Sequence, residues 1–266
     1  MDRLRAYQPS ILVIGDLMLD HYLWGKCERI SPEAPVQVVD VQSESTVLGG
    51  AGNVVNNLLS LDANVSVLSV VGNDDNGKEL LNMLETLGAD AKGIIKQEDR
   101  KTSKKSRVIA SHQQVVRYDS ESKDDITEVS VDALLAQCEI YIPTVDAILL
   151  SDYGKGVLTT TFTCKVIELA KKHKKSILVD PKGDDYRKYS GATLITPNKK
   201  EASIATKIAI KPRSQRAHIA PRNKNILATM PAKYQIKKNV KTSQATLSVR
   251  LVGGRYRNAL NSLKIK

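Results

Sequence analysis

Short apolar runs recur along the first 200 residues, and polar residues, glycine or proline follow most of them. Strands covered on both faces of a parallel sheet have this continuous apolar pattern. The runs are residues 10–15, 66–72, 147–151, 176–179 and 193–196. Between them, apolar residues recur at helical spacing, as at Leu80, Leu84 and Leu87. This alternation of strands and helices predicts an α/β fold with a doubly wound, mostly parallel central sheet.

Residues 36–42 have a pattern that suits a sheet with one face in water, because apolar and polar side chains partly alternate there. Residues 106–119 look like a hairpin partner for this strand. We expect the two to pair in a small sheet separate from the central one.

Polar side chains gather where five of the predicted segments end. The stretches are residues 15–20, 48–53, 152–156, 180–183 and 196–201. In an open α/β sheet the carboxyl ends of the strands meet at one edge, and ligands bind there. A single polar strand end is commonly an ordinary turn, but five at one edge predict a site.

The glycine-rich stretch at residues 48–53 begins a helix with one apolar stripe. Glycine has no Cβ, so the backbone at Gly49 and Gly50 can approach a ligand closely, and the helix N-terminus adds partial positive charge. Asn53 can donate and accept hydrogen bonds to hydroxyl groups. The alternative is an ordinary glycine turn before a core helix, but the accompanying strand ends favour a ligand site.

Several common types of site are absent from the sequence. It contains no Gly-x-x-x-x-Gly-Lys-Ser/Thr, and no Gly-x-Gly-x-x-Gly follows the first strand. Cys27, Cys138 and Cys164 are widely spaced, which favours reduced thiols over a disulfide framework or a zinc site. No run approaches about 18 apolar residues, and the start lacks the apolar core of a signal peptide. We therefore expect a cytoplasmic protein with no membrane partner.

The net charge of +11 comes from the last quarter of the chain. Residues 202–266 contain 15 Lys and Arg and no Asp or Glu, whereas residues 1–201 contain 25 basic and 29 acidic residues. A basic segment can bind nucleic-acid phosphates. Here, however, the charges are not clustered, and only Tyr234 and Tyr256 are present to stack on bases. We therefore consider a nucleic-acid partner the weaker alternative.

Seven motifs follow one another in an order typical of one protein family. They are Gly15-Asp16-Leu17-Met18-Leu19-Asp20, Arg29-Ile30-Ser31-Pro32-Glu33-Ala34-Pro35-Val36, Gly49-Gly50-Ala51-Gly52-Asn53-Val54, Gln113-Gln114 with Arg117 and Asp119, Asp152-Tyr153-Gly154-Lys155-Gly156, Asp180-Pro181-Lys182 and Thr196-Pro197-Asn198-Lys199-Lys200-Glu201. This order resembles the ribokinase-like (PfkB) sugar kinases. In detail it resembles the kinase half of the bifunctional heptose 7-phosphate kinase and heptose 1-phosphate adenylyltransferase of Gram-negative bacteria. The resemblance covers about residues 8–207.

The resemblance implies a three-layer α/β sandwich with a small β-lid, formed by about residues 33–46 and 104–118, over a sugar-phosphate site. Asp20 and Asn53 would hold sugar hydroxyls, and Lys105, Arg107 and Arg117 are candidates for the 7-phosphate, because guanidinium groups fit phosphate oxygens. The alternative for these three cations is solvated surface charge. The implied substrate-binding residues are Asp16, Asp20, Gly49, Gly50, Asn53, Lys105, Arg107, Gln113, Arg117, Asp152 and Lys155.

The resemblance also implies ATP and Mg²⁺ as cofactors. Asn198 and Glu201 resemble the family's Asn-x-x-Glu element, which organises Mg²⁺ and the ATP phosphates, so Glu201 would act on the metal indirectly. In the alternative interpretation, Glu201 only favours a helix N-terminus. The implied nucleotide and Mg²⁺ residues are Asp180, Lys182, Asn198, Lys199, Lys200 and Glu201.

The chain departs from the family after residue 207. The family's catalytic carboxylate belongs to a late Gly-Ala-Gly-Asp turn, but no acidic residue follows Glu201, so no catalytic residue is identified. We expect residues 1–207 to form an incomplete kinase domain that lacks its C-terminal part. Residues 208–266 are expected to be a basic tail that is out of frame or disordered.

The implied reaction is ATP-dependent phosphorylation of D-glycero-β-D-manno-heptose 7-phosphate at C1, in ADP-heptose and lipopolysaccharide core biosynthesis. We expect little or no turnover from the chain as it stands, and a homodimer formed through the β-lid. The alternatives are another PfkB-type sugar or nucleoside kinase, or a non-catalytic remnant that binds a sugar phosphate.

Overall fold

The central sheet of this protein has six strands in the order β10-β9-β8-β1-β4-β5, and all neighbouring strands are parallel. The computed structural model describes residues 8–111, 113–209, 234–241, 244–251 and 263–264. The strands of this sheet are β1 (Ser10–Gly15), β4 (Asn64–Gly72), β5 (Asp90–Gln97), β8 (Ala147–Ser151), β9 (Ser176–Asp180) and β10 (Leu194–Ile195). The predicted α/β class is confirmed, although the sequence pattern did not predict β5.

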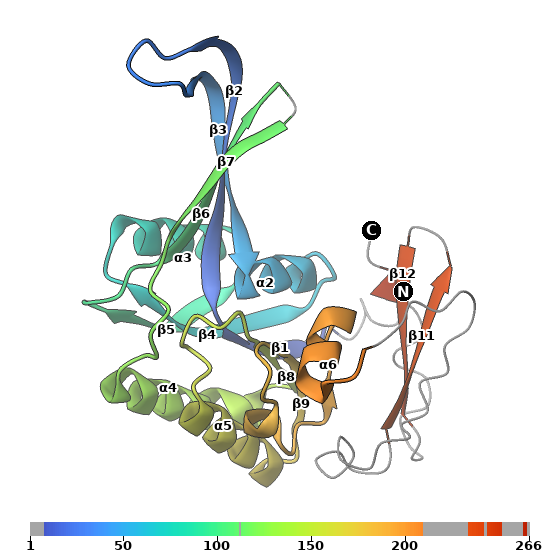
Figure 1. Cartoon of the computed structure of the whole chain (residues 1–266). Coiled ribbons are helices and arrows are strands. Elements are labelled where there is room, and N and C mark those ends of the chain that lie inside the picture. The colour runs from blue at the N-terminus through green and yellow to red at the C-terminus, as the bar shows by residue number, and fades with distance from the viewer. Residues whose placement is uncertain (1–7, 112, 210–233, 242–243, 252–262, 265–266) are drawn as a thin grey trace.

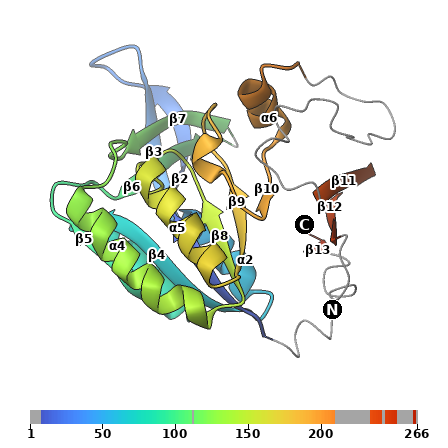
Figure 2. The same cartoon turned by 90° about the horizontal axis from the view of Figure 1, so that it is seen from below.

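Four helices cover the two faces of this sheet, which gives three layers (Figure 1). Helices α2 (Ala51–Leu59) and α3 (Asp75–Thr86) lie on one face, and α4 (Glu128–Tyr141) and α5 (Thr160–Lys172) lie on the other. The view from below shows α4 and α5 in front of the strands (Figure 2). Along β1, Leu12 and Ile14 pack with α4 and α5, while Val13 packs with α2 and α3. Each face is therefore buried under its own helix pair, because successive side chains of a strand point to opposite faces.

Three shorter helical segments complete the described helices. They are the 3₁₀ helices η1 (Ile142–Thr144) and η2 (Arg187–Tyr189), and the α-helix α6 (Lys199–Thr206), which follows β10. Among the described residues, none of the helices has the length and apolar character needed to cross a membrane.

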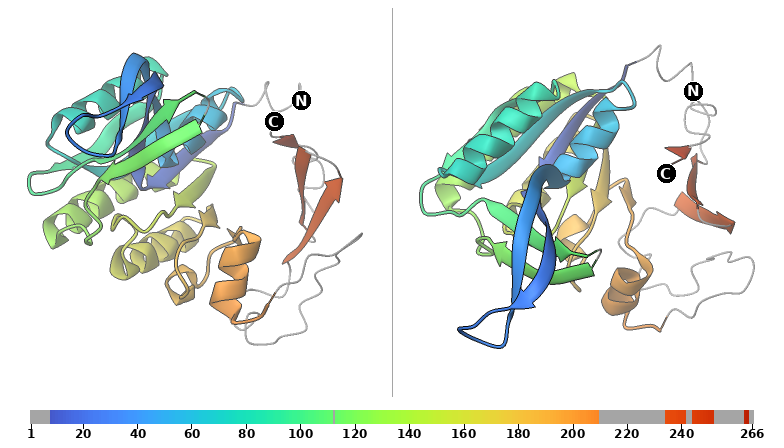
Figure 3. Two further views of the ribbon diagram at one scale, coloured as in Figure 1. Left: turned by 45° about the horizontal axis from the view of Figure 1, so that its top comes forward. Right: turned by 90° about the horizontal axis from the view of Figure 1, so that it is seen from above.

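A second sheet stands out from the central one, and we call it the projecting sheet (Figures 1 and 3). Its strands are β2 (Leu17–Ile30), β3 (Gln37–Gly50), β6 (Ser103–Ala110) and β7 (Gln113–Ser120), in the order β3-β2-β6-β7. Strand β2 pairs antiparallel with β3 and parallel with β6, and β6 pairs antiparallel with β7.

One expectation for the projecting sheet is wrong. Residues 36–42 do not pair with residues 106–119, because β2 lies between β3 and β6. Strand β2, which the sequence pattern did not predict, begins at Leu17 and contains Asp20. Strand β2 is buried where it leaves the central sheet and exposed further out, so its residues show no single apolar pattern.

The last part of the chain contains strands that form a sheet of their own. β11 (Tyr234–Lys241), β12 (Gln244–Leu251) and β13 (Leu263–Lys264) pair antiparallel in that order. Much of residues 208–266 lies outside the described residues. The interpretation of this segment as out of frame or disordered therefore stays a prediction.

Candidate functional site

Four strands of the central sheet bring polar residues to one edge, as the sequence predicts. Asp16 follows β1, Asp152 follows β8, Asp180 ends β9, and Thr196 follows β10. The backbone N–H of Asp152 donates to the carbonyl oxygen of Asp180 at 3.0 Å, which holds two of these ends together. The fifth predicted stretch, residues 48–53, is instead where β3 of the projecting sheet returns to this edge.

The carboxylate of Asp16 organises the loop after β8. Its Oδ2 accepts hydrogen bonds from the backbone N–H groups of Tyr153 (2.8 Å) and Lys155 (3.1 Å), and its Oδ1 accepts one from Val157 (3.2 Å). Burial raises the pKa of Asp16, although these hydrogen bonds oppose the shift. Its three hydrogen-bond donors all belong to the protein, so direct contact between Asp16 and a substrate stays a prediction.

Asp152 is likewise engaged within the protein. Its Oδ1 accepts a hydrogen bond from the backbone N–H of Gly154 at 2.7 Å. Its Oδ2 accepts from the Tyr189 hydroxyl at 2.6 Å and lies 2.7 Å from Nζ of Lys188. Burial and the negative charge of Asp152 both raise the pKa of Tyr189. The loop after β8 is thus fixed by Asp16 on one side and by Asp152 and η2 on the other.

The projecting sheet places four predicted substrate-binding residues on one face. In the strand register, Lys105 of β6 aligns with Asp20 of β2 and with Asp119 of β7. Two residues further along, Arg107 aligns with Tyr22 of β2 and Arg117 of β7 in the same way. Aligned residues and those two apart share a face of a sheet, so Asp20, Lys105, Arg107 and Arg117 lie together.

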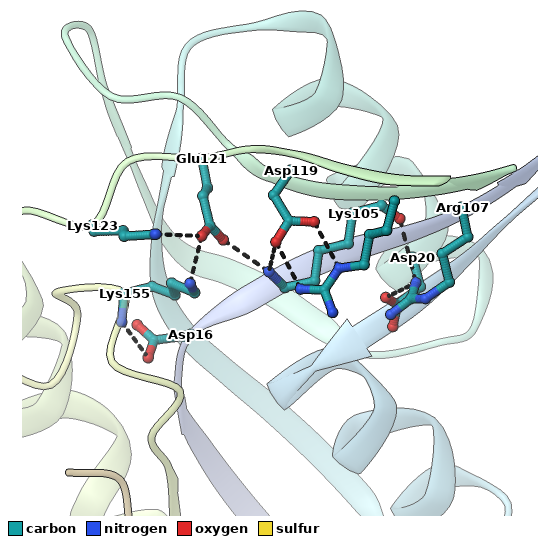
Figure 4. Close-up of polar contacts among 9 residues, drawn as sticks. Asp16, Asp20, Lys105, Arg107, Asp119, Glu121, Lys123 and Lys155 are labelled. Atoms are coloured by element: carbon teal, nitrogen blue, oxygen red, sulfur yellow. Dashed lines mark hydrogen bonds and ion pairs between the residues drawn. The ribbon is translucent and has the colours of Figure 1, made fainter. Parts of the chain in front are cut away.

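The charged groups on this face hold one another in defined positions (Figure 4). Nη1 of Arg107 lies 2.6 Å from Oδ1 of Asp20, and its guanidinium lies over the Tyr22 ring at 5.3 Å. Arg117 binds both carboxylate oxygens of Asp119, at 2.9 and 2.7 Å, which lowers the pKa of Asp119. These guanidinium groups are partly exposed and remain able to donate to a phosphate.

The paired glycines at the end of β3 are required by two neighbouring aspartates. Gly50 has a φ of +56°, and a Cβ there would lie 2.5 Å from the backbone oxygen of Asp16. A Cβ on Gly49 would fall on the carboxylate of Asp20. The protein itself therefore needs both glycines, and their contact with a ligand stays a prediction. Asn53 is exposed in the first turn of α2.

Gln113 is not brought into the row of charged residues. It aligns with Ala110 at the far end of the β6–β7 pair. Ala110 is five residues from Lys105, and this odd spacing places it on the opposite face. A contact between Gln113 and the substrate stays a prediction that this arrangement does not support.

The predicted nucleotide residues lie around the start of α6. Asn198 caps this helix, and its side chain and that of Glu201 form a capping box with reciprocal bonds of 3.0 and 2.9 Å. Glu201 thus has the helix-terminus role of the alternative interpretation, and its Oε1 also lies 3.4 Å from Nζ of Lys182. Lys199 and Lys200 are exposed in the first turn. Direct nucleotide contact by this set stays a prediction.

Acidic groups near Glu201 provide a partial test of the implied Mg²⁺. Burial and the negative charge of Glu201 raise the pKa of Asp180, so the two carboxylates are close enough to repel each other. The Tyr186 hydroxyl is buried without a hydrogen-bond partner among the described residues, and burial, with the charges of Glu201 and Asp180, raises its pKa to about 12. Within the described part of the chain, no three His, Cys, Asp or Glu side chains could hold a metal by themselves. One or two carboxylates completed by nucleotide phosphates and waters suit Mg²⁺, so these residues fit such an ion.

The sequence motifs missed two residues that build this edge. Glu121 lies just after β7 and contacts Lys105 and Lys155. Arg100 is buried, and its guanidinium donates to the backbone oxygens of Asp124 (3.1 Å) and Lys155. Neither residue lies in one of the seven motifs, and a single charged residue between elements gives no pattern from which to predict its contacts.

Comparisons with known proteins agree with this architecture. The model for pfkB family carbohydrate kinases matches residues 8–243, which extends past the change in composition near Ile208. The bifunctional protein HldE of Sulfurimonas denitrificans is 59% identical over 211 residues, covering 79% of this chain and 44% of that protein. The bifunctional protein HldE of Aliarcobacter butzleri is 58% identical and covers 77% and 43%. The chain thus spans less than half the length of these relatives.

Solved structures share the fold at low sequence identity. A putative phosphofructokinase from Staphylococcus aureus is similar with a TM-score of 0.65 at 13% identity, covering 88% of this chain and 78% of that one. Arabidopsis thaliana ribokinase complexed with ribose and ATP is similar with a TM-score of 0.51 at 16% identity, covering 75% and 63%. With the family match over most of its length, the chain belongs to the pfkB family of carbohydrate kinases.

Proposed function

We propose that this chain is the kinase part of a heptose 7-phosphate kinase. It would transfer the γ-phosphate of ATP to the C1 hydroxyl of D-glycero-β-D-manno-heptose 7-phosphate and form the 1,7-bisphosphate, on the route to ADP-heptose and the lipopolysaccharide core. The identity of 59% to a bifunctional protein HldE supports this branch of the family.

The observation that carries the proposal is the row of charged residues on the projecting sheet. Asp20 presents a carboxylate that accepts hydrogen bonds from sugar hydroxyls, and Arg107 and Lys105 beside it supply positive charge for a phosphate on the same ligand. A carboxylate next to cations on one face suits a ligand that is both hydroxylated and phosphorylated. An unphosphorylated sugar or a nucleoside would make no use of the hydrogen-bond donors that these cations keep beyond their ion pairs within the protein.

ATP is proposed to bind on the other side of the edge, near α6. Lys182, Lys199 and Lys200 supply positive charge for its phosphates. A Mg²⁺ ion bound with the nucleotide would be held by Asp180 and, indirectly, by Glu201, and would neutralise charge on the transferring phosphate. Lys182 is placed to orient Glu201, since their side-chain atoms lie 3.4 Å apart.

Binding experiments distinguish this proposal from its alternatives. Calorimetric titration with heptose 7-phosphate should give an affinity at least about tenfold higher than titration with the unphosphorylated heptose, because a charge-assisted bond to phosphate is lost. Fructose 6-phosphate and adenosine serve as controls for another sugar or nucleoside kinase. Preference for either control would overturn the substrate assignment, and binding without turnover would favour a sugar-phosphate-binding remnant.

The projecting sheet is also proposed to form a homodimer. Val116 and Tyr118 of β7 are about half exposed, at 48% and 51%. They align with Val108 and Ser106, and so lie on the face opposite Arg107. Apolar side chains gathered on an exposed sheet face favour contact with a second copy.

A further inference from the structure

One carboxylate outside the sequence motifs links the projecting sheet to the central sheet. Oε1 of Glu121 lies 2.6 Å from Nζ of Lys155, and its Oε2 lies 3.0 Å from Nζ of Lys105 (Figure 4). The Glu121 side chain is only 5% exposed, and those of Lys105 and Lys155 are 12% and 14% exposed. These ion pairs are therefore shielded from water far more than ordinary surface pairs.

The three residues come from different parts of the fold. Lys105 belongs to β6, Glu121 follows β7, and Lys155 lies in the loop after β8 of the central sheet. Two hydrogen bonds fix the backbone of Lys155, because its N–H donates to Asp16 and its carbonyl accepts from Arg100. A continuous set of polar contacts thus runs from β1, through Lys155 and Glu121, to the charged face of the projecting sheet.

We propose that Glu121 is a positioning residue that fastens the projecting sheet to the rim of the central sheet and orients the ammonium groups of Lys105 and Lys155 towards one anionic ligand. Each ammonium group has three donors. Lys155 donates one to Glu121, and Lys105 donates one to Glu121 and one to Asp119, so each keeps a donor for a phosphate. Hydrogen bonds from Lys155 and Lys105 outweigh burial and lower the pKa of Glu121, so the carboxylate stays charged at neutral pH. The ligand part of this inference rests on the proposed function, whereas the fastening does not.

A second ion pair, between Lys104 and Glu79, provides a matched control. Lys104, the neighbour of Lys105 in β6, lies 3.8 Å from Glu79 of α3, so this pair also joins the projecting sheet to the rest of the molecule. The distance is longer, and the Glu79 side chain is 39% exposed. A pair of this kind contributes little, because solvent screens it. Glu79→Gln therefore removes the same charge without disturbing the proposed fastening.

Hydrogen–deuterium exchange of the unliganded protein tests the fastening directly. In Glu121→Gln, peptides that cover residues 103–110 and 153–157 should exchange about tenfold faster than in the unmodified chain, because local opening no longer breaks two charged hydrogen bonds. Peptides from β1 and β4 should be unchanged, which shows that the variant is folded. Glu79→Gln should exchange as the unmodified chain does. Unchanged exchange at both peptides in Glu121→Gln would overturn the proposal.

Calorimetry with heptose 7-phosphate tests the orientation of the two ammonium groups. The affinity of Glu121→Gln should fall about tenfold, while the affinity for ATP stays the same. Equal or tighter sugar-phosphate binding by the variant would overturn this part, because Glu121 would then compete with the phosphate. If neither protein binds heptose 7-phosphate but exchange still increases in the variant, the fastening stands and the proposed substrate fails.

Discussion

At the residue scale, the position of the Asp20 carboxylate is set by residues from other strands. Its carboxylate is held at 2.6 Å by Arg107, which comes from a strand far away in the sequence. Gly49 leaves room for the same carboxylate, since a Cβ there would occupy its place. The aspartate, the arginine and the glycine are therefore one unit, and a change in any of them alters the position of the others.

Removing the polar groups of Asp20 or Asn53 should weaken heptose 7-phosphate binding. Asp20→Ala and Asn53→Ala should each cost about 1–3 kcal/mol, because the sugar hydroxyls lose a partner on one side only. Asp40→Ala, at an exposed position of β3, is the control and should bind normally. Unchanged calorimetric affinity in both test variants would refute the assignment of this sugar site.

The sequence predicted which candidate residues lie near one another better than it predicted the direction of their side chains. Asp20, Lys105, Arg107 and Arg117 meet on one face, but that face exists only because β2 and β6 pair. Asp16 and Asp152 belong to matching motifs, yet their carboxylates accept hydrogen bonds from the protein itself. Motif spacing does not specify whether a side chain points to a ligand or to its own loop, so this distinction required the structure.

At the scale of elements, the buried runs were predictable and the mixed strands were not. β1, β8 and β9 read as strands because both their faces are covered and their residues are almost all apolar. β2 changes along its length from buried to exposed, and the sequence pattern did not predict it. A strand that crosses from one sheet environment to another has no single period, so no local pattern predicts it.

The N-terminus of α3 should contribute stability that depends on pH. Asp74 caps this helix by accepting from the backbone N–H of Gly77 at 2.7 Å, and it also accepts from that of Thr102 at 2.9 Å. Burial alone would raise the pKa of Asp74, but the hydrogen bonds from Thr102 and Gly77 outweigh it and lower the pKa below its ordinary value of 3.8. Asp74→Ala should reduce the free energy of unfolding by about 1–2 kcal/mol at neutral pH.

The decrease in the free energy of unfolding caused by Asp74→Ala should be smaller at acidic pH. Because the folded-state pKa is the lower one, the charged form stabilises the fold above pH 3.8, and the contribution disappears as the pH falls through the folded value. Urea unfolding of both proteins at neutral and at acidic pH measures the difference. If the difference in the free energy of unfolding between the two proteins increased on acidification, Asp74 would not have the capping role assigned to it.

The outer face of β7 should decide whether the protein dimerises. Replacing Val116 and Tyr118 by lysine places like charges on the exposed apolar surface of the projecting sheet. Sedimentation velocity should then show a monomer where the unmodified chain sediments as a dimer. The double variant Val129→Lys/Ile140→Lys on α4 changes two exposed apolar residues elsewhere and should leave the sedimentation unchanged. A monomeric unmodified chain would remove the proposed interface.

At the scale of the whole molecule, the sequence after residue 207 bears on catalysis. The family resemblance implies a late carboxylate that assists the attacking hydroxyl, and no acidic residue follows Glu201 in this sequence. General-base assistance is worth about 10²–10⁴-fold, and loss of the neighbouring anion-stabilising turn should cost about another 10²–10³-fold. We therefore expect little or no turnover from the chain as it stands.

An ATP-consumption assay with heptose 7-phosphate measures this deficit. The comparison is a version of the protein that carries a C-terminal region of the family type after residue 207. Comparable rates from the two proteins would mean that an earlier carboxylate acts as the base. Asp152 and Asp180, at the carboxyl edge of the central sheet, are the residues to change next.

The parallel pairing of β2 with β6 also affects how the chain reaches its fold. His21 and Ser106, which face each other across this pair, are 85 residues apart in the sequence, so the contact closes a long loop. During synthesis the β2–β3 hairpin therefore emerges early, with the β2 edge bare until β6 has left the ribosome. An unpaired edge of this kind can be joined by the same strand of another nascent chain. The projecting sheet therefore passes through a stage with an unpaired strand edge, during which it needs protection from other nascent chains.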